Sequence, residues 1–327
     1  MTKKHRVPTT RKRPVPAQKQ RAPRPDRRRE LLFGALALGL LLAVVLGAAL
    51  GLSSLRDDGG GLIAEEDPLA PTEDPGPIHV HGLGVNPGDG ALYIATHTGL
   101  WRVGPEEKRA ERIGDRLQDT MGFTVAASDR FLGSGHPDPR DVRDGRLPPL
   151  LGLIESTDAG KTWRPISLLG KADFHVLRNA GDRVYGFDAT NERLMVSRDK
   201  GRTWSEHRPP APVIDLVTDP RRSERVLAAT ERGLFESDDA GRSWRARSES
   251  AGLLAWPAPN RLYAVDGRGR VFASADAGRE WRTVGDIGGR PAALLATAPR
   301  ELYVALHDGT IKRSATGGAS WNLRSTP

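Results

Sequence analysis

The stretch Ser197-Arg198-Asp199-Lys200-Gly201-Arg202-Thr203-Trp204 decides the fold, because the chain repeats its pattern, S-x-D-x-G-x-S/T-W, at intervals of 37 to 41 residues. Two more full copies and two copies with one changed position follow the same pattern: residues 156–163, 237–244, 274–281 and 314–321. A period of about 40 residues is typical of a β-propeller in which each repeat forms one four-stranded blade.

The residue types of the pattern favour a tight hairpin turn. An aspartate side chain accepts hydrogen bonds from nearby backbone N–H groups, and glycine adopts positive φ without steric cost. A tryptophan at the end of the turn buries a large apolar surface between neighbouring sheets. We therefore assign a structural role to the aspartates of four copies: Asp158, Asp199, Asp239 and Asp276.

When the repeats are aligned, a second set of similar segments gives the number of blades. Short apolar segments, each a candidate second strand, recur six times: residues 91–95, 130–134, 183–187, 225–229, 261–265 and 301–305. The first blade lacks the turn pattern, although Gly99-Leu100-Trp101 matches Gly233-Leu234-Phe235 of the fourth. The sequence predicts an all-β, six-bladed propeller of twenty-four short strands, with no helix outside the membrane.

The turn pattern resembles the Asp-box, or BNR, repeat of sialidases, sortilin-type receptors and photosystem assembly factors over residues 78–323. Residues 79–83 (HVHGL), 95–99 (ATHTG) and 134–137 (SGHP) are similar to bacterial membrane-anchored propellers that are often named glycosyl hydrolases. The resemblance implies the fold, whereas such repeats occur in enzymes, receptors and assembly factors alike.

Charge and hydropathy divide the part of the chain before the propeller. Residues 1–30 carry a net charge of +10 and read as a disordered cytoplasmic tail. Residues 31–52 contain no charged side chain and predict a retained transmembrane helix. Residues 53–77 are rich in Pro, Gly and acidic residues and predict a linker to the propeller at 78–327. Since the chain's net charge is +8, the part after residue 30 sums to −2, and we expect no nucleic-acid partner.

The flanking arginines predict the orientation of the anchor. Arg27, Arg28 and Arg29 precede it, so the positive-inside rule places the N-terminus in the cytoplasm and the propeller outside. A twin-arginine export signal at Arg28-Arg29 is the alternative. The chain has no cysteine, which excludes a lipoprotein, disulfides, thiol catalysis and zinc–thiolate sites.

The sequence gives little support for a sialidase, because its candidate catalytic residues recur at the same position in several repeats. An Arg-Ile-Pro segment is absent, and the four tyrosines (Tyr93, Tyr185, Tyr263 and Tyr303) share one strand position, which indicates packing. A glycoside hydrolase acting on extracellular glycans remains the alternative function. Its candidate carboxylates are Glu231, Asp188 and Asp266, which lie near turns between second and third strands.

Six of the eight histidines are expected at the end of the propeller opposite the repeated turns, where the first strand of each blade begins and the second strand ends: His79, His81, His97, His136, His175 and His307. Asp119 and Asp173 are expected at the same end, and an insertion at residues 135–150 follows a second strand there. It is placed to act as a lid.

Three interpretations of these histidines stay open. They cap turns, they take part in catalysis, or His79, His81, His97, His136 and His175 bind a divalent transition metal or a polar ligand with Asp119 or Asp173. Our leading hypothesis is a membrane-tethered binding or assembly propeller whose histidine-rich face meets a metal, a glycan, a small polar ligand or a protein partner.

Overall fold

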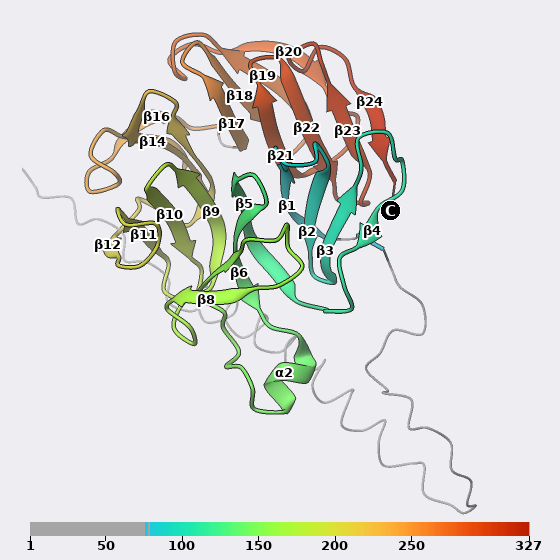
Figure 1. The fold of residues 1–327 in the computed structure, drawn as a ribbon. Helices are drawn as coiled ribbons and strands as arrows, with labels where there is room; N and C mark the ends of the chain where they lie inside the picture. The colour runs from blue at the N-terminus through green and yellow to red at the C-terminus, as the bar shows by residue number, and fades with distance from the viewer. Residues whose placement is uncertain (1–75, 78, 251, 327) are drawn as a thin grey trace, which may run out of the picture. The chain divides into compact units, whose positions relative to one another are not determined.

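The computed structural model describes residues 76–77, 79–250 and 252–326, which form six four-stranded antiparallel sheets around a common centre (Figure 1). All of them belong to the compact unit Leu69–Pro327. The predicted tail, the predicted anchor and nearly all of the predicted linker lie outside the described residues. Within those residues, no helix has both the length and the apolar character needed to cross a membrane.

Each sheet is one blade, numbered 1 to 6 along the chain, and its strands a to d follow one another in sequence. Blade 1 contains β1 (Val80–Val85), β2 (Leu92–Thr96), β3 (Gly99–Val103) and β4 (Glu111–Arg112). Blade 2 contains β5 (Asp119–Ala127), β6 (Arg130–His136), β7 (Leu153–Ser156) and β8 (Arg164–Ser167). Blade 3 contains β9 (Phe174–Ala180), β10 (Arg183–Asp188), β11 (Arg193–Ser197) and β12 (Ser205–His207).

The second half of the ring repeats this arrangement. Blade 4 contains β13 (Val213–Asp219), β14 (Arg222–Thr230), β15 (Gly233–Ser237) and β16 (Arg245–Ser248). Blade 5 contains β17 (Leu253–Ala258), β18 (Arg261–Val265), β19 (Arg270–Ser274) and β20 (Arg282–Asp286). Blade 6 contains β21 (Pro291–Ala298), β22 (Glu301–Leu306), β23 (Ile311–Ser314) and β24 (Asn322–Ser325). The predicted six blades and their second strands are thus confirmed.

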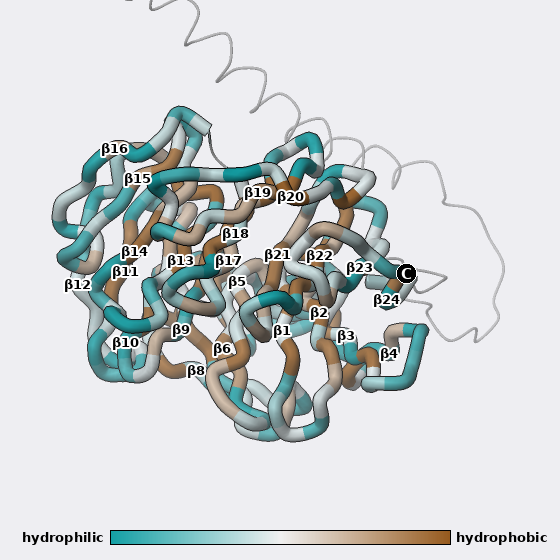
Figure 2. The backbone as a smooth tube through the Cα atoms, turned by 90° about the horizontal axis from the view of Figure 1, so that it is seen from above, coloured by the Kyte–Doolittle hydropathy of each residue, from teal (hydrophilic) through white to brown (hydrophobic). Residues whose placement is uncertain are grey.

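The core of the propeller lies between the blades. Six clusters of buried apolar side chains join blades 1–2, 2–3, 3–4, 4–5, 5–6 and 6–1 in turn. Figure 2 shows the hydrophobic residues concentrated in the inner strands, while the outer strand β16 and the turns are mostly hydrophilic. Since each blade buries apolar side chains against both neighbours, the closed ring stabilises every sheet.

The repeated pattern forms the turn between strands c and d. In the copy at 197–204, Ser197 Oγ donates to Asp199 Oδ1 at 2.8 Å and accepts from the Gly201 N–H at 2.8 Å. Asp199 also accepts from the backbone and side chain of Thr203 at 2.9 and 2.7 Å. The copies with Asp158 and Asp239 repeat this network. The copy with Asp276 keeps the backbone bond, from the Glu280 N–H, but has no hydroxyl at that position.

The expectation of strands alone outside the membrane was wrong at one place. The insertion in blade 2 contains a short helix, α2 (Pro139–Arg143), whose N-cap Asp138 accepts from the Arg140 N–H at 2.9 Å. Asp138 also accepts from the Leu117 N–H at 2.9 Å. These bonds fasten the insertion to the segment between blades 1 and 2, and Figure 1 shows α2 away from the ring centre, so the lid expectation has no support.

Candidate functional site

A cavity of about 310 Å³ lies at the centre of the ring, and strand a of every blade lines it. The register of the sheets shows which end of the cavity carries the histidines. In blade 2, Asp119 lies opposite His136 at one end of the sheet, and Phe131 lies opposite Ser156, the start of the repeated turn, at the other. The histidines are therefore at the end opposite the repeated turns, as expected.

In five of the six blades, a β-bulge at the same place in strand a aims one side chain at this cavity. Five blades skip one residue in the pairing of strands a and b, and all five skipped residues line the cavity: His81, Met121, His175, Ile214 and Ala292. Bulges commonly re-aim side chains in this way. Because methionine, isoleucine and alanine occupy the same position, the blade requires the bulge but does not require a histidine there.

His81, His97 and Asp119 form one cluster across blades 1 and 2. One ligand atom from each of them lies within 4.8 Å of the other two. His97 Nδ1 lies 2.8 Å from Asp119 Oδ2, and the rings of His81 and His97 meet edge to face with centroids 4.4 Å apart. His79, with a left-handed φ of 54°, lies beside them, its ring centroid 5.3 Å from that of His97.

The protonation state of His81 follows from its surroundings. Burial and the neighbouring imidazoles of His97, His175 and His79 lower the pKa of His81 to about 4. Its Nε2 lies 3.6 Å from Asp119 Oδ1, and neither atom has a hydrogen-bond partner among the described residues. At neutral pH the imidazole is neutral, so a nitrogen lone pair is available to a ligand.

A second cluster spans blades 2 and 3. Asp173 is 6% exposed, and its Oδ2 lies 2.9 Å from His175 Nε2 and 3.5 Å from His136 Nε2. The hydrogen bond from His175 to Asp173 raises the pKa of His175. The structure thus divides the predicted site residues into two neighbouring groups, whereas His307, on blade 6, joins neither.

The carboxylates of the hydrolase alternative occupy separate blades. Asp188 is buried and accepts hydrogen bonds from the N–H groups of Asp173 and Thr190. Asp266 accepts from the Arg268 and Arg270 N–H groups and so closes its own turn. Glu231 is exposed. The structure does not bring these three side chains together.

Residues that recur at the same position in several blades have structural roles. Each of the four tyrosines is buried, and each hydroxyl donates to an oxygen of the protein; Tyr185, for example, donates to the Ser223 carbonyl at 2.6 Å. Glu155 and Glu236 lie in equivalent positions of strand c and pair with arginines, among them Arg130 and Arg225 at 2.6 Å. These groups are packing and bracing elements.

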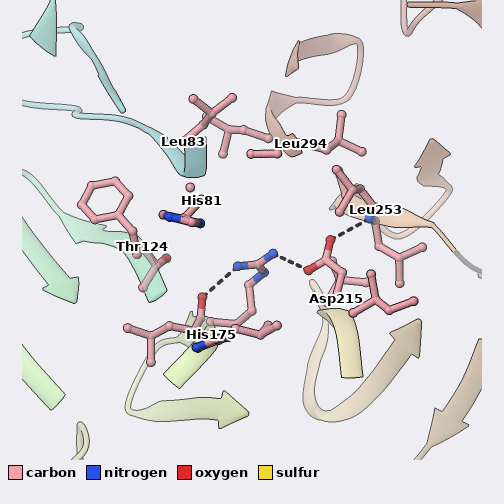
Figure 3. A pocket seen from close by; sticks show the side chains of 18 of the residues that line it. His81, Leu83, Thr124, His175, Asp215, Leu253 and Leu294 are labelled. Carbon is pink, nitrogen blue, oxygen red and sulfur yellow. Dashed lines mark hydrogen bonds and ion pairs between the residues drawn. The ribbon is translucent and has the colours of Figure 1, made fainter. Parts of the chain in front are cut away.

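One polar pair in the cavity wall was missed from the sequence. Asp215, of which 3% is exposed, accepts hydrogen bonds from Arg178 and from the Leu254 N–H at 2.8 Å (Figure 3). Burial raises the pKa of Asp215, and Arg178 opposes that shift. An aspartate within the apolar run Val213-Ile214-Asp215-Leu216-Val217 was the available signal.

Comparison with known proteins adds support for the fold. No family model matches the chain. Among curated proteins, the dispase autolysis-inducing protein of Streptomyces mobaraensis is 33% identical over 95 residues, 28% of this chain and 25% of that protein. The match therefore spans about a quarter of the length of that relative.

Two solved structures are similar over most of the chain. A GH74 enzyme from Niastella koreensis matches with a TM-score of 0.54 and 14% identity, over 76% of this chain and 45% of that one. A chain of a nidogen/laminin complex matches with a TM-score of 0.57 and 14% identity, over 72% of this chain and 93% of that one. At such identities the likeness shows the fold alone.

Proposed function

We propose that this chain is a binding propeller that holds a divalent transition-metal ion at His81, His97 and Asp119. The observation that carries the proposal is the approach of three ligand atoms from two blades to within 4.8 Å of one another. Two imidazoles and one carboxylate suit Zn²⁺, Cu²⁺ or Ni²⁺. The exposed His79, next to His97, offers a further imidazole.

The unpartnered atoms support a cation at this position. In a neutral His81, Nε2 is either an acceptor without a proton or an N–H donor. As an acceptor it cannot bond to Asp119 Oδ1, and as a donor it is too far away at 3.6 Å. Among the described residues, Asp119 has ion pairs with histidines and with no lysine or arginine. In a tetrahedral site with bonds of roughly 2.0–2.2 Å, ligand atoms lie about 3.3–3.6 Å apart, so only small side-chain shifts are needed.

Zinc titration of the full-length chain, purified without a polyhistidine tag, tests the proposal. We expect at least about one equivalent of Zn²⁺ in calorimetry. Since losing an outer-shell partner already costs about 10–100-fold, His81→Ala and His97→Ala should each weaken binding at this site by about 100-fold or more. His307→Ala, an equivalent turn histidine on blade 6, is the matched control and should bind as the parent does. Less than about 0.1 equivalent in the parent protein, or unchanged binding in both cluster variants, contradicts the proposal.

The repeated turns and the N-terminal sequence extend the proposal to the whole chain. The hydrogen-bond network shared by four turns supports assignment to the Asp-box class. Residues 31–52 support a membrane anchor with the propeller outside the cytoplasm. In this arrangement the metal-bearing face meets a protein, a glycan or a small polar ligand. Extraction of membranes at alkaline pH, followed by protease digestion of intact cells, tests the anchor and its orientation.

The glycoside hydrolase alternative depends on Glu231, because Asp188 and Asp266 accept the hydrogen bonds of their own turns. We expect no sugar release from sialylated, fucosylated or cell-wall glycans by either the parent protein or Glu231→Gln. Release by the parent protein that Glu231→Gln abolishes would favour the hydrolase instead.

A further inference from the structure

We infer that a second divalent ion binds beside the first, at His136, His175 and Asp173, so that the histidine-rich face holds a pair of ions. The inference rests on the proposed function, since it extends the same metal-binding face. It is carried by its own residues, which belong to blades 2 and 3.

The second cluster repeats the blade-to-blade relation of the first. In both, a histidine at the end of strand b of one blade (His136) or just after it (His97) faces an aspartate two residues before the bulge residue of the next blade. His97 Nδ1 lies 2.8 Å from Asp119 Oδ2, and His136 Nε2 lies 3.5 Å from Asp173 Oδ2. A bulge histidine completes each set: His81 in the first and His175 in the second. Each set therefore offers two imidazoles and one carboxylate. Among the described residues, only the first set has one ligand atom of each residue within 4.8 Å of the other two, so the second set needs a larger side-chain movement to enclose an ion.

The insertion fixes the tautomer of His136. Its Nδ1 lies 3.0 Å from the Pro149 carbonyl oxygen, which can only accept, so Nδ1 carries the proton. In the neutral ring, Nε2 then has a lone pair that faces Asp173 Oδ2. A backbone carbonyl that holds the far nitrogen of an imidazole is the usual support of a metal-binding histidine. This is the role we assign to residues 135–150 in place of a lid.

Asp173 has the environment of a ligand and lacks that of a bracing carboxylate. It is 6% exposed, and its Oδ1 has no hydrogen-bond partner among the described residues. The histidines are its only ion-pair partners in that part of the chain, whereas the fully buried Glu236 pairs with Arg225, Arg245 and Arg247. A buried carboxylate oxygen without a partner is costly, and a cation would satisfy it.

The two clusters are close enough to act as one centre. Asp119 of the first lies directly opposite His136 of the second in the β5–β6 pair, and side chains of opposite residues begin about 5 Å apart. Figure 3 shows His81 and His175 projecting into the same cavity. Four imidazoles and two carboxylates thus provide three ligands for each ion, and the cavity offers room for further ligands.

Stoichiometry in single-cluster variants separates this inference from the proposed function. We expect about two equivalents of Zn²⁺ per full-length chain, about one in His97→Ala and about one in His175→Ala. His136→Ala and Asp173→Asn should also retain about one. His136 and His175 are partly exposed, so their variants test the site even if Asp173→Asn folds poorly. His307→Ala should keep both ions.

Two outcomes overturn the inference while the proposed function stands: one equivalent in the parent protein that His97→Ala abolishes, or a second equivalent that survives both His136→Ala and His175→Ala. Loss of all binding in the parent protein overturns both. The Cu²⁺-loaded protein gives an independent readout, because two adjacent Cu²⁺ ions couple magnetically. We expect a half-field signal in electron paramagnetic resonance that His175→Ala removes, and an uncoupled spectrum in the parent protein contradicts a paired centre.

Discussion

Carboxylates near the blade ends differ in the side chains that face them, and this difference separates bracing residues from the candidate ligands. Glu155 pairs with Arg130 and Arg164, so its charge is neutralised within the blade. Asp119 and Asp173 instead face imidazoles. A group arranged for a ligand often costs stability when the ligand is removed.

Asp119→Asn tests this cost at a single residue. In the metal-free protein, the substitution removes a carboxylate whose Oδ1 faces His81 without a hydrogen bond, so we expect an unchanged or higher midpoint of thermal unfolding. Excess Zn²⁺ should raise that midpoint in the parent protein, because it binds the folded state, and should raise it less in the variant, which loses one of the two sites. Paired thermal scans with and without Zn²⁺ provide the measurement. A metal-free variant that is clearly less stable would show that Asp119 serves the fold.

Asp138 predicts a pH dependence. Burial would raise its pKa, but hydrogen bonds from Arg140 and from the Leu117 N–H outweigh burial and hold the pKa well below the usual value. A carboxyl group whose pKa is lower in the folded state than in the unfolded state stabilises the fold at every pH above its unfolded-state pKa, which is near 4. This stabilisation is lost as the pH falls from there toward the folded-state pKa. Asp138→Ala should therefore lower the unfolding free energy by about 1–3 kcal/mol at pH 7.

The difference between the parent protein and Asp138→Ala should narrow as the pH falls from about 4 toward 2. Urea unfolding at several pH values measures it. A constant difference across this range would mean that the charge of Asp138 contributes nothing.

At the scale of the element, the repeated turn requires two successive residues with positive φ. Lys200 has φ of 60° and Gly201 has φ of 86°, and the other copies repeat these values closely. The glycine also meets the neighbouring blade: a Cβ on Gly201 would lie 2.1 Å from Leu153 Cδ2 in strand c of blade 2. Leu153 is fully buried. The glycine of the pattern therefore serves both the turn and the blade interface.

Gly201→Ala separates these two requirements. We expect a loss of about 2–4 kcal/mol, from left-handed backbone strain and from overpacking against Leu153. Gly181→Ala is the matched control, since φ there is 69° but a Cβ would meet nothing within 4 Å. It should cost about 1–2 kcal/mol from strain alone. Equal losses in urea unfolding would show that contact with Leu153 is unimportant.

At the scale of the whole molecule, the ring closes by apposition of blades 6 and 1. Arg324, which is 8% exposed, donates to the Gly104 and Glu107 carbonyls at 2.5 Å each. Beside it, Arg109 and Thr326 form an isolated bridge, and an apolar cluster joins the two blades. No strand is exchanged between blades within the described residues, because every sheet contains four consecutive strands.

Arg324→Met should therefore weaken the closure. We expect a loss of about 2–5 kcal/mol, because charge-assisted bonds disappear and the carbonyls of Gly104 and Glu107 lose their donor. Amide hydrogen exchange should rise first in β1 and β24. Arg313→Met, which removes an exposed pair with Glu301, should cost about 1 kcal/mol or less. Exchange that rises evenly around the ring in Arg324→Met would contradict a local closing role.

The sequence predicted the parts of this structure that repeat. The turn pattern and the strand-b column specified six blades, and counting strands placed His97 and His136 at one end. By contrast, α2 within the insertion and the buried Asp215 were missed. Both depend on contacts with other parts of the chain: Asp138 reaches Leu117, and Asp215 reaches Arg178 and Leu254.

The sequence by itself determined the architecture and the end of the propeller that carries the histidines, because a repeat period and strand alternation are properties of neighbouring residues along the chain. Only the tertiary structure decided that these histidines form two groups, one around Asp119 and one around Asp173. That grouping depends on distances between different blades, which are fixed by the closed ring and by bulges that turn His81 and His175 toward its centre.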